Sequence, residues 1–150
     1  MVKNRTFWLV AGLGVMLDQL SKWGVVQALG LGESWPLWPG VLHVTYVLNT
    51  GAAFSLFVQG TLWLRWLSVG VSLALVLWAV TGPRLSLGEQ WGYGLILAGA
   101  VGNGIDRFRL GAVIDFIDVR AIGFPIFNLA DTWINMGLVC LFWAYLRQRR

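Results

Sequence analysis

The sequence predicts an α-helical integral membrane protein that crosses the bilayer four times. Of its 150 residues, 57% are hydrophobic and 12% are charged, and the mean hydropathy is +0.69. Soluble domains are less apolar and carry about 25% charged residues. The apolar residues also gather into four runs of membrane length. We expect these runs to form one membrane-embedded domain that covers residues 1–150.

Four segments approach the roughly 17 to 25 residues that a transmembrane helix needs. They cover residues 6–29, 61–80, 89–108 and 131–146. The first follows Lys3 and Arg5, as in a secretory signal peptide, but polar residues replace the small-residue cleavage site, so we expect a retained span. Between the second and third segments, Gly82 and Pro83 break the helix. The second and third spans should therefore be antiparallel neighbours.

The two longer connections would lie on the same face of a four-span protein. In the first of them, residues 41–48 read VLHVTYVL, a β-branched and aromatic stretch that predicts a strand. The second, residues 109–130, is interrupted by glycine and proline and predicts no spanning helix. The basic residues at Arg84 and at both chain ends have few acidic neighbours, which favours cytoplasmic termini.

The net charge of +4 does not indicate a nucleic-acid partner. The eleven basic residues are scattered or flank the apolar segments, so they form no basic stripe. We expect membrane lipid as a partner and no nucleic acid. The single histidine, His43, and the single cysteine, Cys140, cannot supply a zinc-type ligand set. We therefore expect no metal and no cofactor.

Acidic residues give the strongest functional signal. Five of the seven map to span ends or connections on the same predicted face: Asp18, Asp106, Asp115, Asp118 and Asp131. A carboxylate near hydrocarbon should face a protein interior or a wet cavity, and it marks a candidate functional site. Two carboxyl groups in a low-dielectric cleft can share one proton and hydrolyse a peptide bond. Spacing alone leaves the pairing open, because Asp115 and Asp118 would share a helix face whereas Asp115 and Asp131 would meet only through the fold.

Five short motifs, in order along the chain, resemble those of the lipoprotein signal peptidase family, also called signal peptidase II. They are residues 18–22 (DQLSK), 49–55 (NTGAAFS), 102–107 (GNGIDR), 111–116 (GAVIDF) and 127–131 (FNLAD). Ala98, where the third motif often begins with glycine, is a small departure. The resemblance implies an aspartic endopeptidase of the bacterial inner membrane. Such an enzyme removes the signal peptide from prolipoproteins by cutting just before a diacylglyceryl-modified cysteine.

The resemblance also implies the residues of the site. The family's catalytic aspartates fall on Asp115 and Asp131, and its small extracytoplasmic β-sheet, between spans 1 and 2, falls on residues 43–54. The supporting and substrate-binding positions fall on Asp18, Lys22, Asn49, Gly51, Asn103, Asp106, Arg107 and Asn128. We expect a monomer that acts on lipidated prolipoproteins, with its active site near the outer face of the membrane.

Structural roles stay open for several of these positions. Asp18 and Lys22, at i and i+4, are expected to form a helical ion pair. Asn103 and Arg107 have the same spacing and would share a helix face, which suits either the bracing of a loop or the holding of a substrate backbone. Asp118 belongs to no motif and is expected to be a solvated loop carboxylate.

Other functions are open on sequence alone. A protease of the presenilin type would also use two aspartates, but residues 102–106 place an extra residue before the acid of its Gly-x-Gly-Asp signature. A small cation or proton channel is a second alternative, because intramembrane carboxylates also mark ion paths. A lipid-binding scaffold with structural carboxylates is a third. Cleavage of a lipidated precursor, measured against ion flux in vesicles, separates a protease from a channel.

Overall fold

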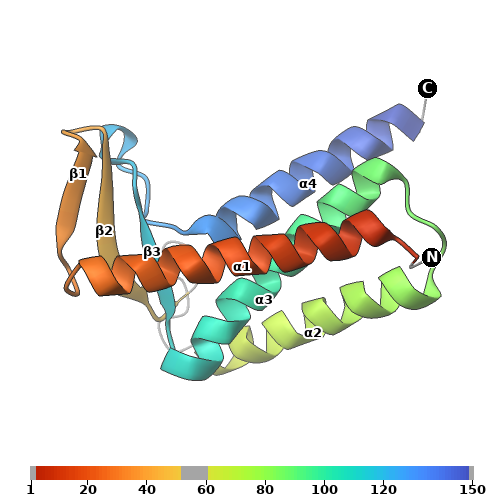
Figure 1. The fold of residues 1–150 in the computed structure, drawn as a ribbon, viewed down its shortest axis with the longest axis horizontal. Coiled ribbons are helices and arrows are strands. Elements are labelled where there is room, and N and C mark those ends of the chain that lie inside the picture. Colours follow the sequence, from red (N-terminus) through yellow and green to blue (C-terminus); the bar gives the residue numbers. More distant parts are fainter. Residues whose placement is uncertain (1–2, 52–60, 149–150) are drawn as a thin grey trace.

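The helices run alongside one another, and a small sheet lies at one end of them (Figure 1). The structure of the chain, a computed structural model, describes residues 3–51 and 61–148. Within these residues, four α-helices and three strands follow in the order α1, β1, β2, α2, α3, β3 and α4, with a 3-10 turn at Arg120–Ile122. The described chain ends lie at the end of the bundle opposite the sheet (Figure 1).

The helix bounds agree with the apolar runs of the sequence to within two residues. They are α1 Arg5–Ala28, α2 Thr61–Thr81, α3 Leu87–Leu110 and α4 Leu129–Gln148. Among the described helices, α1, α2 and α4 are long and apolar enough to cross a membrane by length and composition. The helix α3 is equally long, but glycines and charged residues such as Asp106 and Arg107 interrupt its apolar sequence. The prediction of a mostly helical membrane protein with a small sheet is confirmed.

The sheet is antiparallel, and its strand order is β1-β2-β3. Strands β1, Ser34–Trp38, and β2, Leu42–Asn49, follow α1; the strand-like sequence predicted β2 but not β1. The third strand, β3, Val113–Asp118, comes instead from the connection between α3 and α4, and it pairs Asp115 with Val47 of β2. Its apolar residues are buried on both faces, so they lack the alternation that identifies a half-buried strand. Residues 52–55 of the second motif lie outside the described residues.

Two local signals determine where α3 starts and stops. At its start, the Ser86 hydroxyl accepts a hydrogen bond from the Glu89 N–H, and the Glu89 carboxylate accepts one from the Ser86 N–H, which makes a capping box. At its end, Gly111 adopts a left-handed conformation with φ of 71°, which glycine tolerates without strain. The chain turns there and enters β3 two residues later.

The helix α3 packs against α1, α2 and α4, and its glycines permit close contact. A Cβ atom added at Gly99 would collide with the carbonyl oxygen of Ala130 in α4. One added at Gly102 would lie 2.5 Å from a carboxylate oxygen of Asp18 in α1. Lipid tails are as apolar as the side chains, so helices in a bilayer associate through close packing and interhelical hydrogen bonds. Small residues on α3 serve this packing.

Asn4 ties the start of α1 to the turn between α2 and α3. Its side-chain amide donates a hydrogen bond to the Ala79 carbonyl at 2.9 Å, and its side-chain oxygen accepts one from the Leu85 N–H at 3.0 Å. The two helices on either side of this turn are antiparallel neighbours, as predicted from the Gly82-Pro83 break (Figure 1).

Replacing Gly99 with alanine should destabilise the fold, because the added methyl group has no space between α3 and α4. Overpacking of this kind lowers the free energy of unfolding by about 1–3 kcal/mol. Gly70 of α2 is a matched control, since nothing lies within 4 Å of an added Cβ atom. Gly70→Ala should leave stability unchanged or raise it slightly. Detergent-induced unfolding followed by circular dichroism measures both, and equal effects would contradict the close contact.

Candidate active site

Asp115 and Asp131 line the same cavity, whose volume is about 470 Å³. Asp115 lies on β3, and Asp131 lies in the first turn of α4. Asn128 bridges them: its side-chain amide donates to Asp115 Oδ1 at 2.6 Å, and its side-chain oxygen accepts from the Asp131 N–H at 2.9 Å. One side chain therefore joins the carboxyl group on the strand to the backbone of the residue that carries the carboxyl group on the helix.

Asp115 is almost fully buried, with 2% of its surface exposed. The Asn49 side chain donates to its Oδ2 atom at 2.9 Å, and the Gly51 N–H donates to the Asn49 side-chain oxygen at 3.0 Å. Burial, reinforced by the charge of Asp131, raises the pKa of Asp115 to about 7, although the hydrogen bonds from Asn49 and Asn128 oppose the rise. Asp115 can therefore remain protonated up to nearly neutral pH.

Asp131 has different surroundings. It stands at the positive end of the α4 dipole, which favours negative charge. The Asn103 side chain donates to its Oδ1 atom at 2.8 Å, and the Asn128 N–H donates to its Oδ2 atom at 3.3 Å. The half-buried guanidinium of Arg107 interacts electrostatically with both carboxyl groups. Two carboxyl groups whose surroundings differ in this way suit separate acid and base roles.

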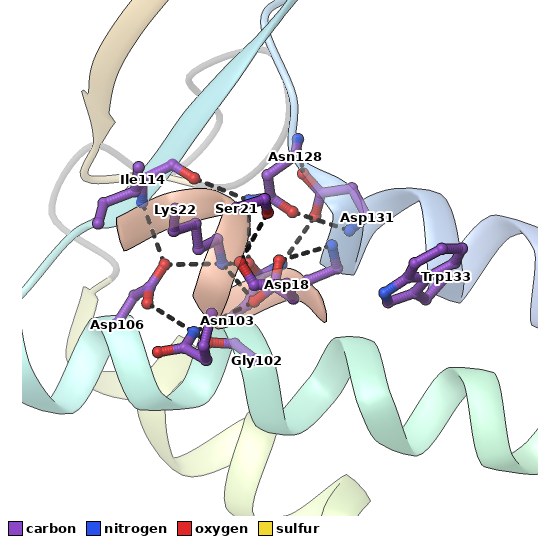
Figure 2. A network of polar contacts seen from close by, with 12 residues as sticks. Asp18, Ser21, Lys22, Gly102, Asn103, Asp106, Ile114, Asn128, Asp131 and Trp133 are labelled. Atoms are coloured by element: carbon purple, nitrogen blue, oxygen red, sulfur yellow. Dashed lines mark hydrogen bonds and ion pairs between the residues drawn. The ribbon is translucent and has the colours of Figure 1, made fainter. Parts of the chain in front are cut away.

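A buried ion network of α1 and α3 lies close to Asp131 (Figure 2). We call it the α1–α3 brace, and it consists of Asp18, Gln19, Lys22 and Asp106. The Lys22 ammonium is 2.9 Å from a carboxylate oxygen of Asp18 and 2.7 Å from one of Asp106. The Gln19 amide donates to both carboxylates at 3.1 Å. The i, i+4 ion pair predicted for Asp18 and Lys22 is confirmed.

The brace also holds the backbone directly before each aspartate of the pair. Asp18 accepts a hydrogen bond at 2.9 Å from the N–H of Ala130, the residue before Asp131. Asp106 accepts one at 3.2 Å from the N–H of Ile114, the residue before Asp115. The carboxylates of the brace thus fix the start of α4 and the start of β3 to the same buried ammonium.

All of the site residues predicted from the sequence lie in this region, but in two environments. Those that line the cavity are Asn49, Gly51, Asn103, Arg107, Asp115 and Asp131. Those that do not line it are Asp18, Lys22, Asp106 and Asn128, each at most 3% exposed. The second group contacts the first or the backbone near it. A catalytic or substrate-binding role for any of these ten residues stays a prediction.

The prediction for Asp118 is wrong. Its side chain is not solvated, because Asp118 is only 8% exposed. It lies at the end of β3 and accepts hydrogen bonds from the Thr45 hydroxyl at 2.7 Å and from Arg120 at 2.9 Å. Asp115 and Asp118 also share no helix face: they are three residues apart on a strand, so they point to opposite sides of the sheet.

Sequence reasoning missed Gln19 and most of the cavity wall. Gln19 is three residues before Lys22, so helical spacing alone places the two side chains on one face. This spacing could have identified Gln19 from the sequence. The wall includes residues 124–127, where Phe124 and Phe127 pack edge to face with ring centroids 5.5 Å apart. No sequence pattern placed this loop, because its position depends on the pairing of Ile117 with Phe127.

A family model described as signal peptidase (SPase) II matches residues 10–147. The chain belongs to the signal peptidase II family. Curated lipoprotein signal peptidases from Synechocystis sp. and Gloeothece citriformis are 61% and 59% identical to it over 145 residues, which cover 96% of this chain and 89% and 91% of theirs. A bacterial membrane enzyme solved by the in meso method at 2.3 Å has a TM-score of 0.88 and 32% identity, covering 99% of this chain and 94% of that one.

Membership of the signal peptidase II family confirms the resemblance drawn from the five motifs. It identifies the chain as a protease, and hence a hydrolase, that is a multi-pass membrane protein. The channel and scaffold alternatives receive no support from these relatives.

In Asn49→Ala the pKa of Asp115 should rise above about 7, because the lost hydrogen bond had favoured the carboxylate. Infrared titration of the protonated carboxyl band measures this, with Asp115→Asn used to assign the band. Asn135→Ala is a matched control. Asn135 also lines the cavity, but it donates to the Asp131 carbonyl and not to Asp115. A pKa in Asn49→Ala at or below the wild-type value would contradict the role of this hydrogen bond.

Proposed function

We propose that this protein is an aspartic endopeptidase that removes the signal peptide from diacylglyceryl-modified bacterial prolipoproteins, cutting just before the lipidated cysteine. The observation that carries the aspartic mechanism is the pair Asp115 and Asp131, which line one cavity and share the Asn128 bridge. The substrate class is supported by the relatives, which are lipoprotein signal peptidases.

In this mechanism, the Asp131 carboxylate takes a proton from a water molecule in the cavity, and the hydroxide attacks the scissile carbonyl carbon. The protonated Asp115 donates a hydrogen bond to the carbonyl oxygen and stabilises its developing charge. When the tetrahedral intermediate collapses, Asp131 returns its proton to the leaving amine. The raised pKa of Asp115 supports this division of roles. No metal, cofactor or covalent intermediate takes part.

We further propose that α3 spans the membrane with the other helices, which gives four spans in a single domain. Asn103 and Asp106 of α3 are buried and both contact Lys22, so these polar groups face the protein interior, which supports the placement of α3 in a bilayer. One chain supplies both aspartates, so a monomer in contact with membrane lipid suffices for the reaction.

The proposed orientation places both termini in the cytoplasm and the active site near the outer face of the inner membrane. Lys3 precedes α1, Arg5 begins it and Arg147 lies in the last turn of α4, and these helix ends are far from the sheet (Figure 1). Basic residues prefer the cytoplasmic side of a membrane, which supports this orientation. Arg149 and Arg150 lie outside the described residues.

The function is tested by incubating the purified protein with a diacylglyceryl-modified precursor and detecting the released signal peptide. Asp115→Asn and Asp131→Asn should each reduce cleavage by at least about 10²-fold, since each removes an acid or base while keeping the side-chain size. Asp118→Asn is a matched control on the same strand, away from the cavity, and should retain activity. Normal turnover by either of the first two variants would remove that aspartate from the mechanism.

Three further arms of this experiment separate the parts of the proposal. Unlipidated precursor should be cleaved poorly, because acyl chains contribute about 0.8 kcal/mol per buried CH₂; equal cleavage would contradict the substrate class. Activity should survive EDTA, and a loss restored by a divalent ion would contradict the metal-free mechanism.

The pH profile should be bell-shaped, with activity falling as pH rises through about 7, where Asp115 loses its proton.

The orientation is tested by labelling with a membrane-impermeant thiol reagent in a Cys140→Ser background. Ile122, next to the sheet, is 72% exposed, so Ile122→Cys should react from the outside. Pro83 lies exposed in the turn between α2 and α3 at the opposite end, so Pro83→Cys should not react until the membrane is opened. Labelling of Pro83→Cys alone in intact cells would invert the orientation.

A further inference from the structure

We propose that Lys22 is a positioning residue of the active site, which fixes the direction of the Asn103 amide and thereby presents a hydrogen-bond donor to Asp131. The proposal rests on the aspartic mechanism above and concerns how Asp131 is kept as the base. Lys22 is 1% exposed and is not among the residues that line the cavity, so it acts through Asn103 and not on the substrate.

The contacts form a continuous path from α1 to Asp131 (Figure 2). The Lys22 ammonium donates to the Asn103 side-chain oxygen at 3.1 Å. The nitrogen of the same amide donates to Asp131 Oδ1 at 2.8 Å. A single side chain of α3 therefore separates Lys22 from the proposed base.

The hydrogen bonds along this path can run in only one sense, because the Lys22 ammonium group can donate hydrogen bonds but cannot accept them. The two ends of an asparagine amide are nearly the same size, so only the neighbouring groups decide which end faces which partner. Turning Asn103 over would bring its NH₂ group against the Lys22 ammonium and its oxygen against the Asp131 carboxylate. Both contacts would then be repulsive. Lys22 therefore favours the orientation of Asn103 in which Asp131 receives a donor.

The Asn128 amide supports the same direction. It donates to the Asn103 oxygen at 3.0 Å and to the Ile114 carbonyl at 3.2 Å, while its own oxygen accepts from the Asp131 N–H. The Ile114 carbonyl can only accept and the Asp131 N–H can only donate, so these two backbone groups fix the direction of the Asn128 amide. With both amides fixed, the Asp131 oxygens face donors from Asn103 and from the Asn128 backbone, and such donors stabilise a carboxylate.

The charges around this path explain why the brace is needed. Lys22 faces Asp18 of α1 and Asp106 of α3, and it interacts electrostatically with Asp115 of β3. These carboxylates offset the cost of burying an ammonium. A neutral amine would have a lone pair, could accept from the Asn103 NH₂ group and would no longer fix its direction. Asp131 itself faces Asp115 and the Arg107 guanidinium.

The alternative is that Lys22 only holds α1 against α3. Gln19 separates the two possibilities, since it bonds the same two carboxylates but neither Asn103 nor Asn128. A purely structural loss should appear in both Gln19→Met and Lys22→Met as lower thermal stability alone. A positioning role predicts a further effect in Lys22→Met, on kcat and on the acid limb of the pH profile.

The experiment measures kcat, KM and the pH profile of cleavage, together with thermal unfolding. Lys22→Met should lower kcat by about 10- to 100-fold with little change in KM, as expected when a catalytic group is misplaced. The acid limb should move to higher pH, because Asp131 loses a donor. Lys22→Arg, which also has donors only, should restore much of the rate. Gln19→Met should leave the pH profile in place.

A double variant distinguishes an effect of Lys22 through Asn103 from a direct electrostatic effect of the Lys22 charge on Asp131. If Lys22 acts through Asn103, Lys22→Met should cause no further shift of the acid limb in an Asn103→Ala background. A full shift there, or an unshifted acid limb in Lys22→Met alone, would overturn the proposal. Should Lys22→Met not fold, Asp106→Asn is added to remove the unpaired charge, and the same comparison is made against Asp106→Asn alone. Failure of the wild type to cleave the lipidated precursor would instead refute the proposed function.

Discussion

The buried ammonium of Lys22 is the interaction on which the rest of the site depends. Its two carboxylate partners, Asp18 and Asp106, each use a further oxygen lone pair to hold a backbone N–H, at Ala130 and at Ile114. One cation thus connects α1, α3, β3 and α4. Removing one member of such a network leaves an uncompensated buried charge, which costs more than losing an exposed pair. The position of both aspartates of the pair follows from this network.

Helix packing and the brace impose a shared requirement on α3. The network needs α1 and α3 to be close enough for direct ion pairs, and this closeness leaves no room for a side chain at position 102, where Gly102 faces a carboxylate oxygen of Asp18. Gly99, which has no side chain, likewise permits the close approach of α4. The polar and glycine residues that make α3 the least apolar of the described helices are therefore the ones that let it occupy the centre of the bundle.

The sequence predicts the helices well, because apolar runs of membrane length have few other interpretations. It predicts β2 from its β-branched residues, but not β3, whose burial on both faces removes the alternating pattern. The acidic residues were recognised as a group, whereas the meeting of Asp115 with Asp131 required either the family motifs or the fold. Asp118 was assigned to solvent because nothing in the sequence reveals that Thr45, far away along the chain, covers it. Gln19 was recoverable from helical spacing.

Attachment of β3 and α4 to one buried cation also bears on how the protein responds to its membrane. Helices that do not match the thickness of a bilayer adjust by tilting. A tilt would separate two carboxyl groups carried by unconnected elements, one in a sheet and one in a helix. Here Ile114 and Ala130, each adjacent to one of them, are anchored to the same charge cluster. The two carboxyl groups then move together, so a change in lipid composition that bends the surrounding bundle should alter the distance between them little.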